Sequence, residues 1–205
     1  MTDPGKYFTA IKKHFGTEKL TELYHTNEFT LTVAVALPAQ ATDKHVNTVT
    51  PKLFAVADTP EKMLALGEAG LKEIIKSISF FNNKAKNIIG MARAVISDFG
   101  GVIPNDINDL VKLPGVGRKT ASVFLAEYFK LPAIAVDTHV IRVSNRLGLT
   151  KSKNPDIIER DLAKLIDKKD WRLVNLYLVL FGRYYCKAKK PMCDTCKLKR
   201  YCEFS

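Results

Sequence analysis

The sequence predicts an all-α fold, and three observations support this prediction. Apolar residues recur every three or four positions along most of the chain, whereas the strict alternation typical of strands is rare. Polar capping residues followed by proline or an acidic residue mark helix starts. No Ser/Gly-rich linker or low-complexity stretch divides the chain. If the chain forms two lobes, we therefore expect them to be closely joined.

The composition indicates a globular protein with a polyanionic partner. Hydrophobic residues make up 46% of the 205 residues, which is ample for a packed core. The 32 Lys and Arg against 21 Asp and Glu leave a net charge of +11. Neutralising phosphates releases condensed counterions, so this excess favours a nucleic acid, although ordinary solvated surfaces are also often basic. The longest apolar stretches, residues 29–38 and 173–181, are too short to cross a bilayer, and the chain begins without a signal-peptide core. We expect a cytoplasmic protein.

The expected helices are bounded by capping residues and glycines. Starts are predicted at Asn27, at Thr59-Pro60-Glu61 and at Asn154-Pro155-Asp156, where a polar cap precedes proline or an acidic residue. Glycines are expected to mark helix ends or turns, and these are Gly70, Gly100, Gly101, Gly115, Gly117 and Gly148.

Residues 106–128 read as a helix-hairpin-helix. One helical pattern ends near Lys112, a tight turn covers residues 113–117, and a second helix opens near Arg118. Gly115 and Gly117 allow the backbone to turn sharply, so the amides of Gly115, Val116, Gly117 and Arg118 are candidates for holding a phosphate. An ordinary helix–helix connection is the alternative. A dinucleotide-binding loop is disfavoured, because the pair follows a helix and Thr120 stands where a third glycine would be.

Two cations open the second helix, and they differ in chemistry. Arg118 stays protonated, whereas the amine of Lys119 can lose its proton and attack a sugar C1′ to form a Schiff base. The alternative is that Lys119 merely contacts a phosphate.

The apolar segment 131–136 leads into Asp137, which is expected at the start of another helix. Followed by Thr138, Asp137 is a good N-cap, and this role alone would explain it. As a catalyst it would deprotonate the lysine or stabilise positive charge developing on the sugar.

The four cysteines lie within 186–202 with the spacing Cys186-x6-Cys193-x2-Cys196-x5-Cys202, and the rest of the chain has none. This clustering makes a dispersed disulfide framework implausible and predicts a metal site. Four thiolates satisfy either zinc or a [4Fe–4S] cluster, and the spacing favours the cluster modestly, because zinc ribbons usually show two close pairs. The intervening lysines, Lys187, Lys189 and Lys190, form either a phosphate clamp or a solvated loop.

Four segments together resemble the endonuclease III family, over nearly the whole chain; they are residues 36–47 (ALPAQATDKHVN), 80–88 (FFNNKAKNI), 113–121 (LPGVGRKTA) and 135–149 (AVDTHVIRVSNRLGL). The resemblance implies a bifunctional DNA glycosylase and AP lyase that releases oxidised pyrimidines from duplex DNA. It implies that Lys119 is the Schiff-base nucleophile, that Asp137 is the essential carboxylate and that the cysteines bind a [4Fe–4S] cluster.

The same resemblance assigns two residues to the gap left by an extruded base. Gln40 matches the glutamine that the family inserts into DNA, and Phe80 matches a second wedge position. The alternatives are that Gln40 ends a helix and that Phe80 belongs to the core. The chain departs from the family pattern at Pro38, where serine is expected, and at Phe181, where many relatives have histidine. Proline at position 38 is expected to reshape the helix end, and the lesion preference depends on that region.

The resemblance further implies two lobes around a DNA-binding cleft. Residues 21–131 are expected to form a helical barrel that contains the hairpin, and residues 1–20 with 132–205 the lobe of the cluster loop, 186–202. We expect a monomer on DNA. Two competing functions remain open: an adenine- or mismatch-specific glycosylase without lyase activity, and a noncatalytic DNA-binding module with a zinc tail.

Overall fold

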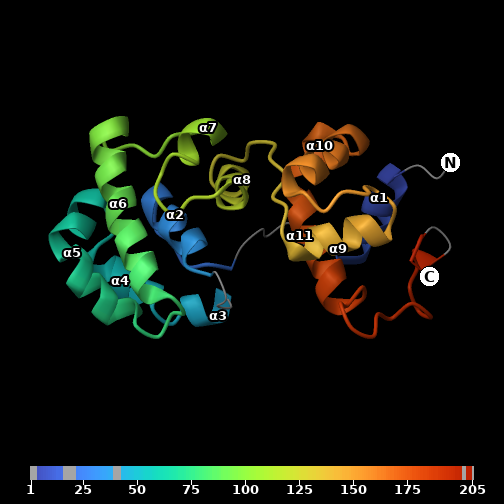
Figure 1. Ribbon diagram of the computed structural model, residues 1–205, viewed down its shortest axis with the longest axis horizontal. Coiled ribbons are helices and arrows are strands. Elements are labelled where there is room, and N and C mark those ends of the chain that lie inside the picture. The colour runs from blue at the N-terminus through green and yellow to red at the C-terminus, as the bar shows by residue number, and fades with distance from the viewer. Residues whose placement is uncertain (1–3, 16–21, 39–42, 200–201, 205) are drawn as a thin grey trace. The chain divides into compact units, whose positions relative to one another are not determined.

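The computed structural model describes the chain except residues 1–3, 16–21, 39–42, 200–201 and 205. The described residues form helices and no strand, which confirms the predicted fold class (Figure 1). No described helix is long and apolar enough to span a bilayer. The elements are α1 (Pro4–Phe15), α2 (Glu28–Ala36), α3 (Asp43–Val46), α4 (Thr50–Val56), α5 (Pro60–Ile75), α6 (Phe81–Phe99), α7 (Ile107–Leu110), α8 (Arg118–Glu127), α9 (Thr138–Arg146), α10 (Pro155–Leu165), the short 3₁₀ helix η1 (Lys168–Asp170) and α11 (Trp171–Tyr184).

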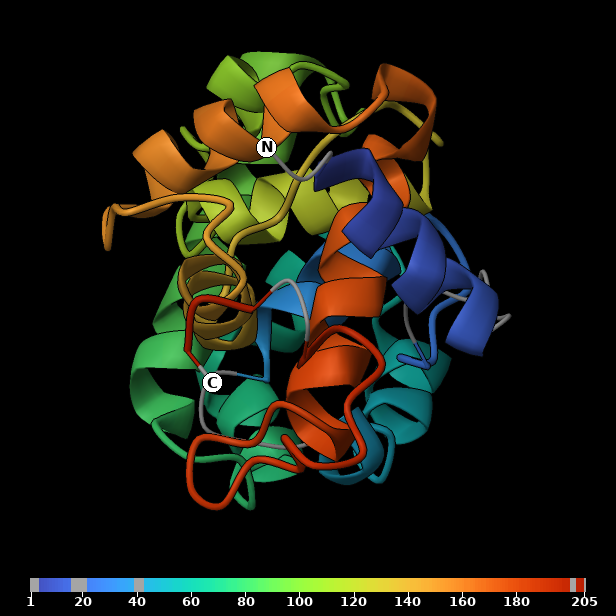
Figure 2. The same ribbon diagram turned by 90° about the vertical axis from the view of Figure 1, so that its right-hand side faces the viewer.

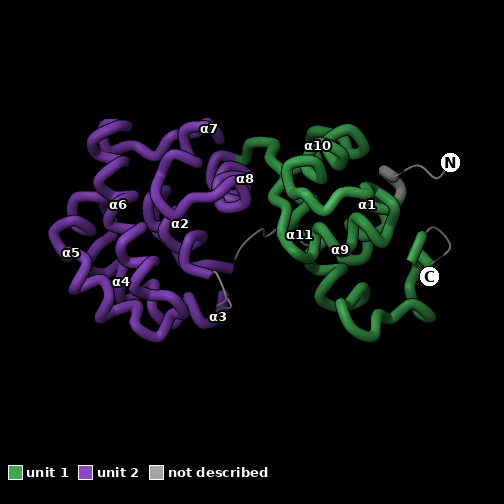
Figure 3. The backbone as a smooth tube through the Cα atoms, viewed as in Figure 1, with its two compact units in different colours: residues 1–20, 130–205 green, residues 21–129 purple. Residues whose placement is uncertain are grey.

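Backbone contacts divide the chain into two compact units, as Figure 3 shows. Unit 1 comprises Met1–Leu20 and Lys130–Ser205, and unit 2 is the continuous segment Thr21–Phe129. Helices α2 to α8 therefore lie in unit 2, and α1 joins α9, α10, η1 and α11 in unit 1.

Unit 2 is built on α2. Every residue from Phe29 to Val35 is buried, and a helix that is buried on all faces has to be central to its unit. Helix α8 packs against α2, while α5 packs along α6 and α4 against α5. These contacts seat the hairpin helix directly on the core of unit 2.

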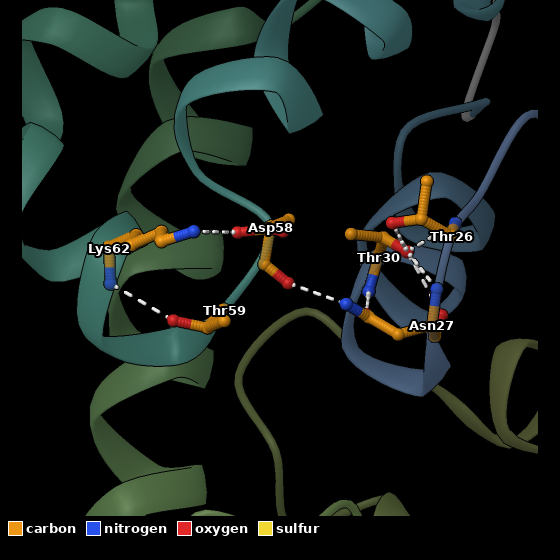
Figure 4. Close-up of polar contacts among 6 residues, drawn as sticks. All are labelled: Thr26, Asn27, Thr30, Asp58, Thr59 and Lys62. Carbon is orange, nitrogen blue, oxygen red and sulfur yellow. Dashed lines mark hydrogen bonds and ion pairs between the residues drawn. The ribbon is translucent and has the colours of Figure 1, made fainter.

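The start of α2 is joined to the start of α5 (Figure 4). The side chain of Asn27 accepts a hydrogen bond from the Thr30 amide at 2.9 Å, and the Thr30 hydroxyl accepts one from the Asn27 amide at 2.9 Å. Nδ2 of Asn27 also donates to the carbonyl of Asp58 at 2.8 Å, immediately before the cap of α5, Thr59. The predicted helix starts at Asn27 and Thr59 are confirmed, and one amide side chain ties them together.

The glycines of α5 correct one expectation from the sequence. Gly70 was expected to end a helix or form a turn, but it lies inside α5. The interruption is at Gly67, whose φ of 70° and ψ of 170° are accessible almost exclusively to glycine. The local sequence offers glycine at both positions, and the helix bends at Gly67. Gly100 and Gly148, with φ of 61° and 70°, adopt the left-handed conformation expected after helices.

Unit 1 has α11 at its centre. Helices α1 and α9 both pack against α11, and Figure 2 shows α1 (dark blue) beside α11 (orange-red) although they lie at opposite ends of the chain. The ring of Phe8 meets that of Tyr177 edge-on, with centroids 5.7 Å apart. Helix α10 starts at the predicted cap, Asn154, and its buried Ile158 and Leu162 complete this core.

Candidate functional site

The predicted hairpin connects a very short helix, α7, with α8. Leu113 and Val116 are buried within the turn, and the amide of Val116 donates to the carbonyl of Leu113 at 3.0 Å. Val116 was a candidate for contacting phosphate. Its side chain instead belongs to the core and its amide closes the turn, so its first role is to shape the hairpin.

Gly115 and Gly117 do not share the role expected of them. Gly115 has a φ of 81°, and a Cβ there would lie 2.9 Å from Cβ of Asn87 on α6. Gly90, one turn further along α6, faces Pro114, which would lie 3.2 Å from an added Cβ. Gly117 has an ordinary φ of −85° and open space where a Cβ would be. The turn needs glycine at 115, and the expectation that both glycines serve the turn was wrong.

Gly117 is the N-cap of α8 and supplies no side chain to its first amides. Lys119 is the second residue of this helix, and it is exposed together with Arg118. The N-terminal end of a helix carries a partial positive charge, so an exposed end flanked by two cations attracts a phosphate. The geometry presents the amine of Lys119 to solvent beside this anion-attracting end.

Asp137 is the N-cap of α9. Its Oδ1 accepts hydrogen bonds from the amides of His139 at 2.8 Å and Val140 at 2.9 Å. Among the described residues no hydrogen bond reaches Oδ2, and the side chain is half-buried. The capping role is therefore present, and it fixes the carboxylate through one oxygen while the second stays available for chemistry.

A polar chain runs from α9 to the end of α11. Arg142 donates to Nδ1 of His139 at 3.1 Å, to the Gly182 carbonyl at 2.9 Å and to the Cys186 carbonyl at 3.1 Å. Burial lowers the pKa of His139; Arg142 and Arg183 lower it further, whereas Asp137 raises it. Because arginine can only donate, His139 accepts at Nδ1 in its neutral form.

All four cysteines line a single cavity, with Phe181 and Tyr185 on its wall. The thiols are half-buried, and Cys186, Cys196 and Cys202 pack against the core of unit 1. Burial raises the pKa of Cys196, and the other three cysteines raise it further, against the opposing effect of the Leu198 amide. Within the part of the chain that the structure describes, no three Cys, His, Asp or Glu side chains are arranged to hold a single metal ion.

Arg146, one helical turn beyond Arg142, binds the start of the cysteine loop. Its guanidinium donates to the carbonyls of Lys187 at 2.7 Å and Ala188 at 3.1 Å, and it lies 3.4 Å from Sγ of Cys186. The side chains of Lys187, Lys189 and Lys190 are exposed. Sequence reasoning missed both arginines, although their spacing of four residues places them on one face of the helix that follows Asp137.

Phe80 is not a core residue. Its side chain is 60% exposed, and its backbone adopts the left-handed conformation, with φ 59° and ψ 29°, directly before α6. The second wedge candidate, Gln40, lies outside the described residues. Pro38 is half-buried and directly follows Leu37, the C-cap of α2, which keeps helical angles with φ −74° and ψ −32°. Helix α2 therefore ends at Ala36, ahead of the proline. The other departure from the pattern, Phe181, is buried at the cysteine cavity.

Comparison with known families gives a match over the centre of the chain. Residues 33–168 match the model of the HhH-GPD superfamily base excision DNA repair proteins. The endonuclease III of Rickettsia conorii is 53% identical over 199 residues, which cover 97% of this chain and 94% of the relative.

Two solved structures are similar over the whole chain. One is a non-covalent complex of an endonuclease III with DNA, with a TM-score of 0.92, 40% identity and coverage of 100% of this chain and 96% of the other. The second is a trapped covalent intermediate of an endonuclease III with DNA, with a TM-score of 0.91, 40% identity and coverage of 100% and 97%.

Proposed function

The chain belongs to the endonuclease III family of the HhH-GPD superfamily, and we propose that Lys119 and Asp137 carry out its chemistry on damaged DNA. As a member of this family it is a bifunctional DNA glycosylase and AP lyase of base excision repair. Its substrate class is oxidised pyrimidines in duplex DNA. The observation that carries the residue assignment is the exposed amine of Lys119 at the uncapped start of α8, where a phosphate is attracted.

In this reaction the ammonium group of Lys119 first loses a proton, with the carboxylate of Asp137 as the acceptor, which leaves the neutral amine as the nucleophile. The amine lone pair forms a bond to C1′, the glycosidic bond breaks, and the base leaves with its electron pair and takes up a proton. Opening of the sugar ring gives a Schiff base. Loss of a C2′ proton then expels the 3′-phosphate oxygen, and water releases Lys119. In the alternative role, in which the Lys119 proton passes to water, the Asp137 carboxylate stabilises the positive charge that develops on the sugar.

Binding rests on exposed cations and backbone amides. Arg118 and the amides at the start of α8 take one phosphate, and Lys187, Lys189 and Lys190 take others along the strand. Arg146 supports the second set, because its bonds to the Lys187 and Ala188 carbonyls fix the backbone that carries these lysines. Gln40 and Phe80 fill the gap left by the extruded nucleotide. The proposal includes a cytoplasmic location, as the sequence analysis expected.

The four cysteines hold a [4Fe–4S] cluster. Their fit rests on the donor set, four thiols lining one cavity, and on the resemblance to the family. The bound cluster would join the ends of the loop 186–202, while Arg142 and Arg146 anchor its start to α9. Purified protein is expected to be brown, with absorbance near about 400 nm and about four irons per chain. Stoichiometric zinc without this absorbance would contradict the assignment.

Single-lesion duplexes test the proposed activity. The strand carrying thymine glycol should be cleaved without alkali, leaving a 3′ unsaturated aldehyde, and Lys119→Ala should lose this cleavage by at least about a hundredfold. Cleavage that requires hot alkali would indicate a glycosylase without lyase activity, and activity on an adenine mismatch instead would overturn the substrate class. Binding without base release would indicate a noncatalytic module.

A further inference from the structure

Lys84 is the one charged side chain that is buried among the residues the structure describes. It lies in the first turn of α6 and is 8% exposed, and burial lowers its pKa. Burying an ammonium group is unfavourable unless it is well paired. A lysine in this position therefore needs a reason beyond surface charge.

The ammonium group of Lys84 joins the end of α2 to the start of α6. Its Nζ donates to the carbonyl of Leu37 at 2.6 Å, across a sequence separation of 47 residues. Leu37 is the C-cap of α2, where carbonyls have no further helical amide to accept from and where a cation is favourable. Leu37 also keeps helical angles directly before Pro38, a conformation that proline disfavours and that this bond helps to hold.

The same turn carries Phe80. The amide of Lys84 donates to the Phe80 carbonyl at 3.1 Å, and Phe80 adopts its left-handed conformation without a side-chain cap. Two residues earlier, Ile78 is 1% exposed and anchors the segment in the core. Nε2 of His45 contacts the Ser77 carbonyl at 3.0 Å and braces the segment a second time. The exposed Phe80 therefore lies in a turn that is held before it by Ser77 and Ile78 and after it by Lys84.

We propose that Lys84 is a positioning residue for base extrusion, which holds the Phe80 turn against the end of α2 so that the ring enters DNA as a rigid wedge. This inference rests on the proposed function and deepens it. A phenylalanine in the left-handed region is strained relative to an ordinary conformation, so this conformation persists only where its surroundings hold it. Inserting an aromatic ring between bases requires that the ring not yield when the stack resists.

The test compares Lys84→Met with Lys86→Met, an exposed lysine on the same helix. Methionine keeps most of the stem and removes the donor to Leu37. Single-turnover base release from a paired lesion should fall at least about tenfold in Lys84→Met, while cleavage at a preformed abasic site should change less than about twofold. A preformed abasic site needs less unstacking, so it depends less on the wedge. Lys86→Met should leave the ratio of the two rates unchanged.

A double-mutant cycle separates positioning from general support. If Lys84 acts through Phe80, adding Lys84→Met to Phe80→Ala should cause no further loss in base release. Should Lys84→Met fail to fold, His45→Leu removes the other brace and should give the same selective loss. Equal losses on both substrates, additive losses in the cycle, or wild-type rates in a folded Lys84→Met would overturn the inference. Failure of the wild-type protein to release a damaged base would instead overturn the proposed function.

Discussion

Asp137 combines a structural and a chemical role in one side chain. Oδ1 satisfies two amides at the start of α9, and Oδ2 accepts no hydrogen bond within the described part of the chain. Capping requires an oxygen acceptor, whereas removing a proton from Lys119 requires a negative charge. The two roles therefore respond differently to substitution.

Asp137→Asn keeps the acceptor and removes the charge. The free energy of unfolding should stay within about 0.5 kcal/mol of the wild-type value, while base release should slow at least about a hundredfold. Asp137→Ala should lose a further ~1 kcal/mol of stability with the cap. Urea unfolding and single-turnover kinetics measure the two effects, and full turnover in a stably folded Asp137→Asn would exclude the catalytic role.

His139 makes the stability of unit 1 depend on pH. Its folded pKa lies below the ordinary value of 6.5, chiefly because of burial, with Arg142 and Arg183 adding to the effect and Asp137 opposing it. The unfolded chain then binds more protons between the two pKa values, so stability rises with pH across this window. The contribution of His139 to stability is lost as pH falls from 6.5 toward the folded pKa.

His139→Asn removes the titrating group and keeps an acceptor for Arg142. Between about pH 7.5 and pH 5.5, the urea midpoint of the wild-type protein should fall more than that of His139→Asn. An NMR titration of the ring protons gives the pKa directly. Parallel declines in the two proteins, or a His139 pKa above the ordinary value, would contradict this prediction.

At the scale of elements, the two glycines of the hairpin have different roles, one in folding and one in DNA binding. Gly115 is in the left-handed region and a Cβ there would collide with Asn87, whereas Gly117 has ordinary angles and open space where a Cβ would be. The open space lies at the start of α8, where a phosphate would approach. Gly115 serves the fold, and Gly117 keeps the amides accessible.

Alanine at each glycine separates these roles. Gly115→Ala should lower the free energy of unfolding by about 1–2 kcal/mol or more, because the new Cβ meets both a disfavoured φ and Asn87. Gly117→Ala should cost less than about 1 kcal/mol yet weaken binding to duplex DNA severalfold. Urea unfolding and fluorescence anisotropy at fixed salt measure the two quantities. The opposite pattern would exclude this division.

The elements that sequence predicted well are those with local signals. Asn27, Thr59 and Asn154 are followed at once by the residues they cap, and the LPGVG turn carries its conformation in five adjacent residues. The bend in α5 was misplaced, because glycine permits a bend at position 67 or at position 70 and the local sequence does not select Gly67. Phe80 was left between core and surface, because exposure depends on the surroundings of the turn.

At the scale of the whole molecule, contacts between distant segments decide what the sequence leaves open. Lys84 and Leu37 are 47 residues apart, and Arg146 and Lys187 are 41 apart. No pattern in a local stretch of sequence predicts these contacts, because the donors, Lys84 and Arg146, are cations, which ordinarily face solvent. The all-α fold, the family and the four cysteines in one cavity follow from the sequence, while the contacts that hold the exposed functional turns come from the folded units.

The central claim is that Lys119 forms the covalent bond to DNA. Borohydride reduces a Schiff base to a stable amine, so wild-type protein incubated with an abasic-site duplex and borohydride should give a cross-linked species. Mass spectrometry of its peptides should locate the adduct on Lys119, and Lys119→Ala should trap at least about a hundredfold less. Trapping of equal yield in Lys119→Ala, or an adduct on another lysine, would contradict the account.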